Sequence, residues 1–183
     1  QKLVHNRPGA LCINTGISNT SDPHQLFVGS EYAAGYRSTM AESHLRNFHP
    51  KPVFSKVPNC KMSTVLENHN IKHIDYFSLD VEGGELEGLK SIDWDKVSIY
   101  LFGIELDNQN PTKDEAVRQL LRDKGFEYRH RIHTDEYWEN PNYFRKSLLF
   151  DKMLRPDYKG EDLNGYGRHV HLHNNDFRAT IGQ

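Results

Sequence analysis

The sequence predicts an α/β fold in which helices pack against a largely parallel sheet. Strand-like runs alternate with helical patterns through the middle of the chain, which is the order of elements in such folds. Two of the runs, residues 74–81 (IDYFSLDV) and 97–106 (VSIYLFGIEL), are nearly continuous in apolar side chains. Strands of this kind are buried on both faces, so we expect them to be parallel neighbours at the centre of the sheet.

The first third of the chain carries weaker signals. Residues 1–7 have the pattern of a last helical turn, and Pro8-Gly9 marks a turn. Residues 10–17 (ALCINTGI) predict a short, mostly buried strand. Residues 18–56 are rich in Ser, Gly, His, Pro and Asn. This composition predicts a long irregular excursion, a type of segment that tends to be functional or mobile.

Helix signals flank the two buried runs. Ser63 is placed to cap a helix over residues 64–70, and a short helix is expected over residues 84–91. Thr112 and Glu115 have the spacing of a capping box, which predicts the start of a third helix.

The end of the predicted domain contains two further strands. Gly125 stands where a glycine commonly ends a helix, and residues 126–133 (FEYRHRIH) alternate in polarity as in an edge strand. Residues 146–153 (KSLLFDKM) predict a last strand. Tyr137 and Trp138 could line an acceptor pocket, but covering the sheet is the role we expect.

The composition limits the classes of function. A chain of 183 residues can form one domain with a core. Its net charge of −2 gives no reason to expect a nucleic-acid partner. There is no apolar run of about 18 residues that could span a membrane, and the amino terminus has no signal-peptide pattern. Cys12 and Cys60 are expected to be free buried thiols, although a disulfide in an oxidising compartment stays open.

Acidic side chains follow both buried runs. Asp80 and Glu82 end the first run just before Gly83 and Gly84, and Glu105 ends the second. The carboxyl ends of parallel strands meet at one rim, where ligands bind in open α/β sheets. Carboxylates there could accept hydrogen bonds from a ligand or act as a general base. They could equally cap the following helix or hold a divalent cation, and the residues alone leave these alternatives open.

Three histidines alternate near the end of the chain, at His169, His171 and His173. In an extended strand they would share one face, and imidazoles are ligands for Zn²⁺ or Cu²⁺. A polar tail with incidental histidines is the interpretation we favour, and metal binding stays open.

One segment resembles a known family. Residues 57–94 (VPNCKMSTVLENHNIKHIDYFSLDVEGGELEGLKSIDW) are similar to the central block of FkbM-type methyltransferases, which depend on S-adenosylmethionine. Weaker similarity extends the resemblance to residues 1–20 and 57–154. The chain therefore resembles the carboxy-terminal part of that domain over residues 1–154, followed by a polar, His-containing extension over residues 155–183.

The resemblance implies a class I (Rossmann-like) methyltransferase sheet, with strand order 3-2-1-4-5-7-6, of which this chain holds strands 3 to 7. It implies that Asp80 and Glu82 lie beside the methyl donor, with Glu105 nearer the acceptor. Asn14 and Gly83 would then contact the cofactor, together with Asp80. The implied reaction moves a methyl group, usually to an oxygen atom. The acceptor would be a small molecule or a glycan-like compound.

The chain departs from the family pattern at its amino-terminal side. The glycine-rich loop after the family's first strand and the acidic ribose-binding residue of its second would precede Gln1, and the chain contains no G-x-G-x-G sequence. We therefore expect this chain alone to bind S-adenosylmethionine weakly and to be inactive. The strand at residues 74–81 would have an open edge, which a protein partner or a missing segment would cover.

Two other classes of function stay open. The amino-acid sequence of residues 76–83 resembles that of animal members of the family. Some of these members are non-catalytic binding modules of membrane-trafficking or secreted proteins. A weaker alternative is a metal-binding module that uses the histidines of the tail. The sequence does not indicate a compartment.

Overall fold

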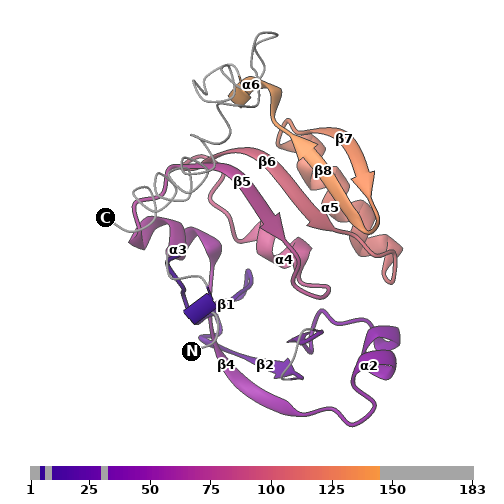
Figure 1. Ribbon diagram of the computed structural model, residues 1–183. Helices are drawn as coiled ribbons and strands as arrows, with labels where there is room; N and C mark the ends of the chain where they lie inside the picture. The colour runs from indigo at the N-terminus through magenta and orange to yellow at the C-terminus, as the bar shows by residue number, and fades with distance from the viewer. Residues whose placement is uncertain (1–4, 7–9, 30–32, 145–183) are drawn as a thin grey trace.

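A computed structural model describes residues 5–6, 10–29 and 33–144 of the chain. It shows a mixed α/β fold with two four-stranded sheets, in the strand orders β1-β4-β2-β3 and β5-β6-β8-β7. We call these the amino-terminal sheet and the carboxy-terminal sheet. Figure 1 shows the two sheets one above the other, with the loop between β5 and α4 turned toward the amino-terminal sheet.

The carboxy-terminal sheet contains both apolar runs. They form neighbouring parallel strands, with Ile74 opposite Ile99 and Leu79 opposite Ile104, so the predicted pairing is confirmed. The predicted central position is wrong for the first of them, because β5 lies at an edge of the described sheet. The strands are β5 (His73–Leu79), β6 (Ser98–Glu105), β7 (Glu127–Ile132) and β8 (Asp135–Glu139).

Strand β8 lies between β6 and β7 and is antiparallel to both. The expectation that Tyr137 and Trp138 cover the sheet is therefore wrong, because both are part of it. Trp138 is 1% exposed, and Glu136 on the same face is 4% exposed. Glu136 can be buried because Arg118 pairs with it at 2.9 Å. The strand was not predicted, because the charged Glu136 at a buried position interrupts the hydrophobic pattern.

Helices cover one face of the carboxy-terminal sheet. Figure 1 shows α4 (Glu85–Lys90) and α5 (Pro111–Asp123) behind it. Two further helices are α3 (Met62–Asn68), ahead of β5, and α6 (Pro141–Phe144), after β8. Apolar side chains of the sheet and of α3, α4 and α5 form one core, which includes Leu89, Phe102, Ile104, Val117, Leu121 and Trp138.

Two of the predicted helix caps are wrong. The backbone N–H of Met62, at the start of α3, donates to the hydroxyl of Ser91 at 3.0 Å, so a residue distant in sequence replaces Ser63 as the cap. Helix α5 starts before the Thr112 box, because Asn110 caps it by accepting from the backbone N–H of Lys113 at 3.1 Å. Proline at the first helical position suits this earlier start.

The predicted excursion over residues 18–56 is also wrong, because most of the amino-terminal sheet comes from it. Pro58 in β4 and the many small or polar residues hid these strands, since proline within a run argues against a strand. Strand β1 is short and pairs only with Asn59 and Cys60 of β4. Pro58 precedes these two residues, so its missing N–H breaks no pairing with β1. The elements are β1 (Gly16–Ile17), β2 (His24–Val28), β3 (Gly35–Tyr36), α2 (Glu42–Phe48) and β4 (Phe54–Cys60).

The strand predicted over residues 10–17 is reduced to Gly16–Ile17. Cys12 and Cys60 are free, as expected, but both are half-buried rather than buried. None of the described helices is long and apolar enough to cross a membrane. Several predictions lie outside the described residues: most of the helix over 1–7, the strand over 146–153, the extension over 155–183 and its three histidines.

Two glycines in the part of the chain that forms the carboxy-terminal sheet and its helices should respond oppositely to alanine. Gly125 has a φ of +83°, where alanine is strained, so Gly125→Ala should destabilise the protein by about 1 kcal/mol. Gly88 lies inside α4, and a Cβ there would meet Leu79 at an ordinary 3.7 Å. Gly88→Ala should therefore stabilise by about 0.5–1 kcal/mol. Urea unfolding of both variants checks the signs, and two changes of the same sign would contradict these conformations.

Candidate functional site

Three carboxylates meet at the carboxyl ends of the two parallel strands, as the sequence predicts. Asp80 directly follows β5, Glu82 follows in the turn, and Glu105 is the last residue of β6. One oxygen from each lies within 4.8 Å of the others. Asp80 is exposed, whereas Glu82 and Glu105 are half-buried. We call these three residues the carboxylate cluster.

The turn after β5 has an unusual backbone. Glu82 has a φ of 54° and Gly83 a φ of 100°, both in the left-handed region. A Cβ on Gly83 would lie 2.7 Å from the carbonyl oxygen of Thr39, which belongs to the segment between β3 and α2. Because Gly83 has no side chain, the backbone of Thr39 can pack closely against it.

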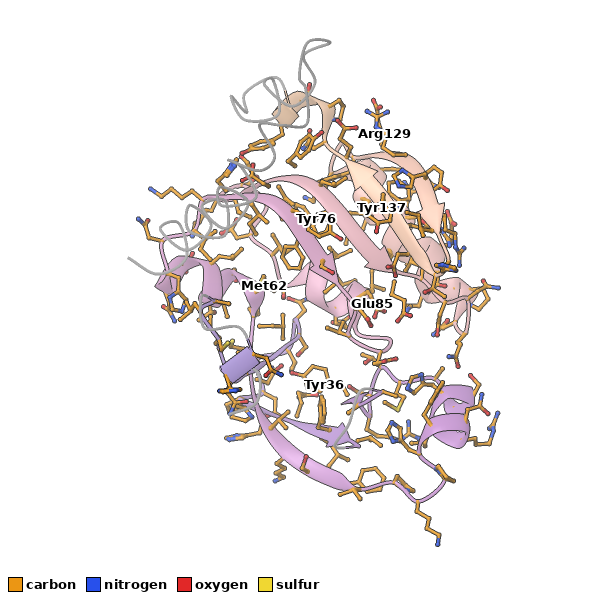
Figure 2. The ribbon with its side chains drawn as sticks, viewed as in Figure 1. Tyr36, Met62, Tyr76, Glu85, Arg129 and Tyr137 are labelled. Atoms are coloured by element: carbon orange, nitrogen blue, oxygen red, sulfur yellow. The ribbon has the colours of Figure 1, made fainter. Side chains whose placement is uncertain are left out.

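The buried carboxylate of Glu85 holds this turn in place. Glu85 is 1% exposed, and its Oε1 accepts hydrogen bonds from the backbone N–H groups of Val81 at 3.2 Å and Gly83 at 3.1 Å. Its Oε2 lies 2.6 Å from the ammonium of Lys113 on α5. Figure 2 shows Glu85 at the end of the carboxy-terminal sheet that faces the amino-terminal sheet.

Lys113 extends the same network to the second loop. Its ammonium lies 3.1 Å from Oδ1 of Asp114, and Oδ2 of Asp114 accepts from the backbone N–H of Asn108 at 2.9 Å. Burial lowers the pKa of Lys113, but Glu85 and Asp114 outweigh it and leave that pKa above its ordinary value. Lys113 and Asp114 were not predicted as site residues, because a Lys-Asp pair in a first helical turn is also typical of a solvated face.

The carboxylate cluster is electrostatically crowded. Burial, followed by the charge and hydrogen bond of Asp80, raises the pKa of Glu105 to about 7, and Glu82 and Asp107 add to this. Burial also raises the pKa of Glu82, and Asp80, Glu85 and Asp107 act in the same direction. His44 opposes them and lowers the pKa of Glu82. At least one carboxyl of the cluster therefore titrates near neutral pH.

The cluster borders a hollow between the two sheets. The residues around it come from the segment from β3 to α2, the turn from β5 to α4 and the segment from the end of β6 to α5, and Asp80 is not among them. They are Thr39, Ala41, His44, Glu82, Gly83, Glu85, Glu105, Asp107, Gln109, Asn110 and Lys113. Asp107 shapes the loop after β6, because its Oδ1 accepts a hydrogen bond from the backbone N–H of Gln109 at 3.0 Å. His44 was missed because it lies in the predicted excursion.

Asn14 does not lie with the other predicted site residues. It is exposed and precedes β1 in the amino-terminal sheet, and it does not line the hollow. The structure thus brings together Asp80, Glu82, Gly83 and Glu105 and leaves Asn14 apart. The three carboxylates offer oxygen atoms that could face a cationic ligand.

These features define a mixed α/β protein with a candidate polar site at the carboxyl ends of its parallel strands. A family model described as the methyltransferase FkbM domain matches residues 2–128, which is more than half of the chain. The chain therefore belongs to the FkbM methyltransferase family. A comparison with curated proteins and a comparison with solved structures found no match.

The ion pair of Glu85 and Lys113 should be a large contributor to stability. Removing one member leaves the other charged and buried, which costs roughly 3–5 kcal/mol. Glu85→Gln and Lys113→Met should each lower the free energy of unfolding by about this amount, measured by urea titration. Lys90→Met is the matched control, because its pair with Glu87 at 3.2 Å is largely exposed and should contribute less than about 1 kcal/mol. Equal losses in all three variants would contradict the assignment.

The raised pKa of Glu105 predicts a specific dependence of stability on pH. A carboxyl with a pKa of about 7 in the folded protein binds more protons there than in the unfolded chain. Its contribution to stability is therefore present at low pH and is lost as pH rises from about 4.5 to 7. Glu105→Gln should gain stability relative to the natural chain above neutral pH, on the order of 1 kcal/mol after allowance for solvent screening. Thermal melts across this range check it, and a gain confined to acidic pH would contradict it.

Proposed function

We propose that this domain carries the acid–base part of an S-adenosylmethionine-dependent methyl transfer to an oxygen. The observation that carries the proposal is the carboxylate cluster at the carboxyl ends of β5 and β6, with one carboxyl titrating near neutral pH. A base whose pKa is near the working pH is suited to take the proton of an acceptor hydroxyl. The family membership of the chain supports the same reaction class.

The arrangement of strands supports a class I (Rossmann-like) methyltransferase sheet. The observed order β5-β6-β8-β7, with β8 antiparallel to its neighbours, matches the 4-5-7-6 part of the implied order. Strand β8 then occupies the position of strand 7 in that order, which we had expected residues 146–153 to fill. In a complete sheet of that class, further strands or a partner would pair with the edge of β5.

The residues present fit the cationic part of the cofactor. S-adenosylmethionine would supply an electrophilic methyl group on a positively charged sulfur. Asp80 and Glu82 would place negative charge near that cation, and Glu105 would hold the proton that the acceptor hydroxyl releases. Gly83 was expected to contact the cofactor, but the space that a Cβ on Gly83 would need is occupied by Thr39. Weak binding of the cofactor by this chain alone stays a prediction.

The acceptor is proposed to be a small molecule or a glycan-like compound with a free hydroxyl. The carboxylates beside the hollow can accept hydrogen bonds from such hydroxyls. A non-catalytic binding module is the alternative function, and the experiment below separates the two, because such a module needs no base at this position.

Asp80→Asn and Glu82→Gln should each lower methyl transfer much more than stability, because the two charges serve a ligand rather than the core. Transfer of a labelled methyl group from S-adenosylmethionine in excess to a panel of polyols and monosaccharides gives the turnover, and melting gives the stability. A general acid–base or charged group of this kind contributes about 10²–10⁴-fold.

Glu87→Gln is the control, since Glu87 shares the first turn of α4 but does not line the hollow. If the two carboxylates instead cap α4, each change should cost about 0.5–2 kcal/mol of stability and leave turnover intact. That result would favour the binding module.

A further inference from the structure

His44 lies on α2 and is 5% exposed. Its Nε2 lies 2.9 Å from the carbonyl oxygen of Ala33, and its Nδ1 lies 3.5 Å from Oε2 of Glu82. A carbonyl oxygen only accepts hydrogen bonds, so Nε2 must carry a hydrogen. Nδ1 therefore faces the carboxylate of Glu82 either with a bare lone pair or with a second N–H.

A bare lone pair would repel the carboxylate oxygen, and the effect is strong where burial limits screening by water. One proton between the two groups removes the repulsion. Only His44 and Lys113 among the residues that line the hollow have basic side chains. Lys113 is already held by Glu85 at 2.6 Å and by Asp114 at 3.1 Å. His44 is thus the basic group placed to compensate Glu82.

The segment from β3 to α2 also packs against the turn that carries Glu82. Glu82 has a φ of 54°, a strained conformation that a non-glycine residue keeps only where its surroundings impose it. A Cβ on Gly35 would lie 3.0 Å from the Cβ of Glu82, so this glycine allows β3 to pack directly on Glu82. Thr39 makes the equivalent approach to Gly83. The segment from β3 to α2 therefore holds Glu82 from both the backbone and the side chain.

We propose that His44 is the positioning residue of the carboxylate cluster, and that its imidazolium, carried by α2, holds the Glu82 carboxylate ionised and oriented at the hollow. The role rests on the proposed function, in which Glu82 faces the cationic methyl donor as a carboxylate. Glu105 has no comparable basic partner in the described cluster, which suits it to the different task of holding a proton.

His49 provides a matched control. Its Nε2 lies 2.7 Å from the same carbonyl oxygen of Ala33, and its ring centroid lies 5.9 Å from that of His44. It does not line the hollow. His49→Gln removes an imidazole that contacts the same carbonyl oxygen as His44. The contact between His44 and Glu82 stays in place in this variant.

Nitrogen NMR of the 183-residue chain near neutral pH tests the charge of His44 directly. His44→Gln assigns the signals of His44 by their disappearance, and glutamine can still donate to Ala33. We expect both ring nitrogens of His44 to be protonated in the natural chain. Glu82→Gln should leave only Nε2 protonated, and His49→Gln should leave the His44 signals unchanged. A neutral His44 in the natural chain would overturn the proposal.

Methyl transfer tests the positioning role. His44→Gln should lower kcat by about 10- to 100-fold, because it loosens a carboxylate that must be held within a fraction of an ångström. His49→Gln should keep both kcat and the melting temperature. An unchanged kcat in His44→Gln would overturn the positioning role. If the natural chain transfers no methyl group to any acceptor, as we expect of this chain alone, the NMR result by itself decides the proposal.

Discussion

The buried carboxylate of Glu85 is the contact on which the rest of the site depends. It accepts two backbone N–H groups of the turn after β5 and pairs with Lys113 of α5 at 2.6 Å. A buried charge is tolerated only when it is paired and hydrogen-bonded, so this carboxylate fixes both the turn and the position of α5. Asp80 and Glu82 are placed as a consequence, because they belong to the turn that Glu85 ties down.

The second constraint is the junction between the two sheets. Gly35 and Thr39 pack on the backbone of Glu82 and Gly83 at distances that leave no room for additional atoms. The amino-terminal sheet therefore supplies one wall of the hollow and the imidazole of His44. The site is therefore built from residues of both halves of the chain.

Strong local patterns predicted part of this arrangement. The parallel pairing of β5 and β6 follows from their apolar runs, and the meeting of Asp80, Glu82 and Glu105 follows from that pairing. Elements that depend on distant partners were missed. Strand β8 buries Glu136 because Arg118 reaches it from α5, and α3 is capped by Ser91 from beyond α4. No local window contains both members of such a pair.

The sequence by itself determined the family, the two parallel strands β5 and β6 and the acidic residues at their ends, because hydrophobic periodicity and strand-end chemistry are local properties. The tertiary structure decided which acidic and basic groups meet. His44 and Lys113 lie 38 and 28 residues from Glu82 and Glu85, and only folding brings each within ion-pair distance of its carboxylate. Electrostatic energies depend on separation in space and on burial, and the linear order of residues contains neither.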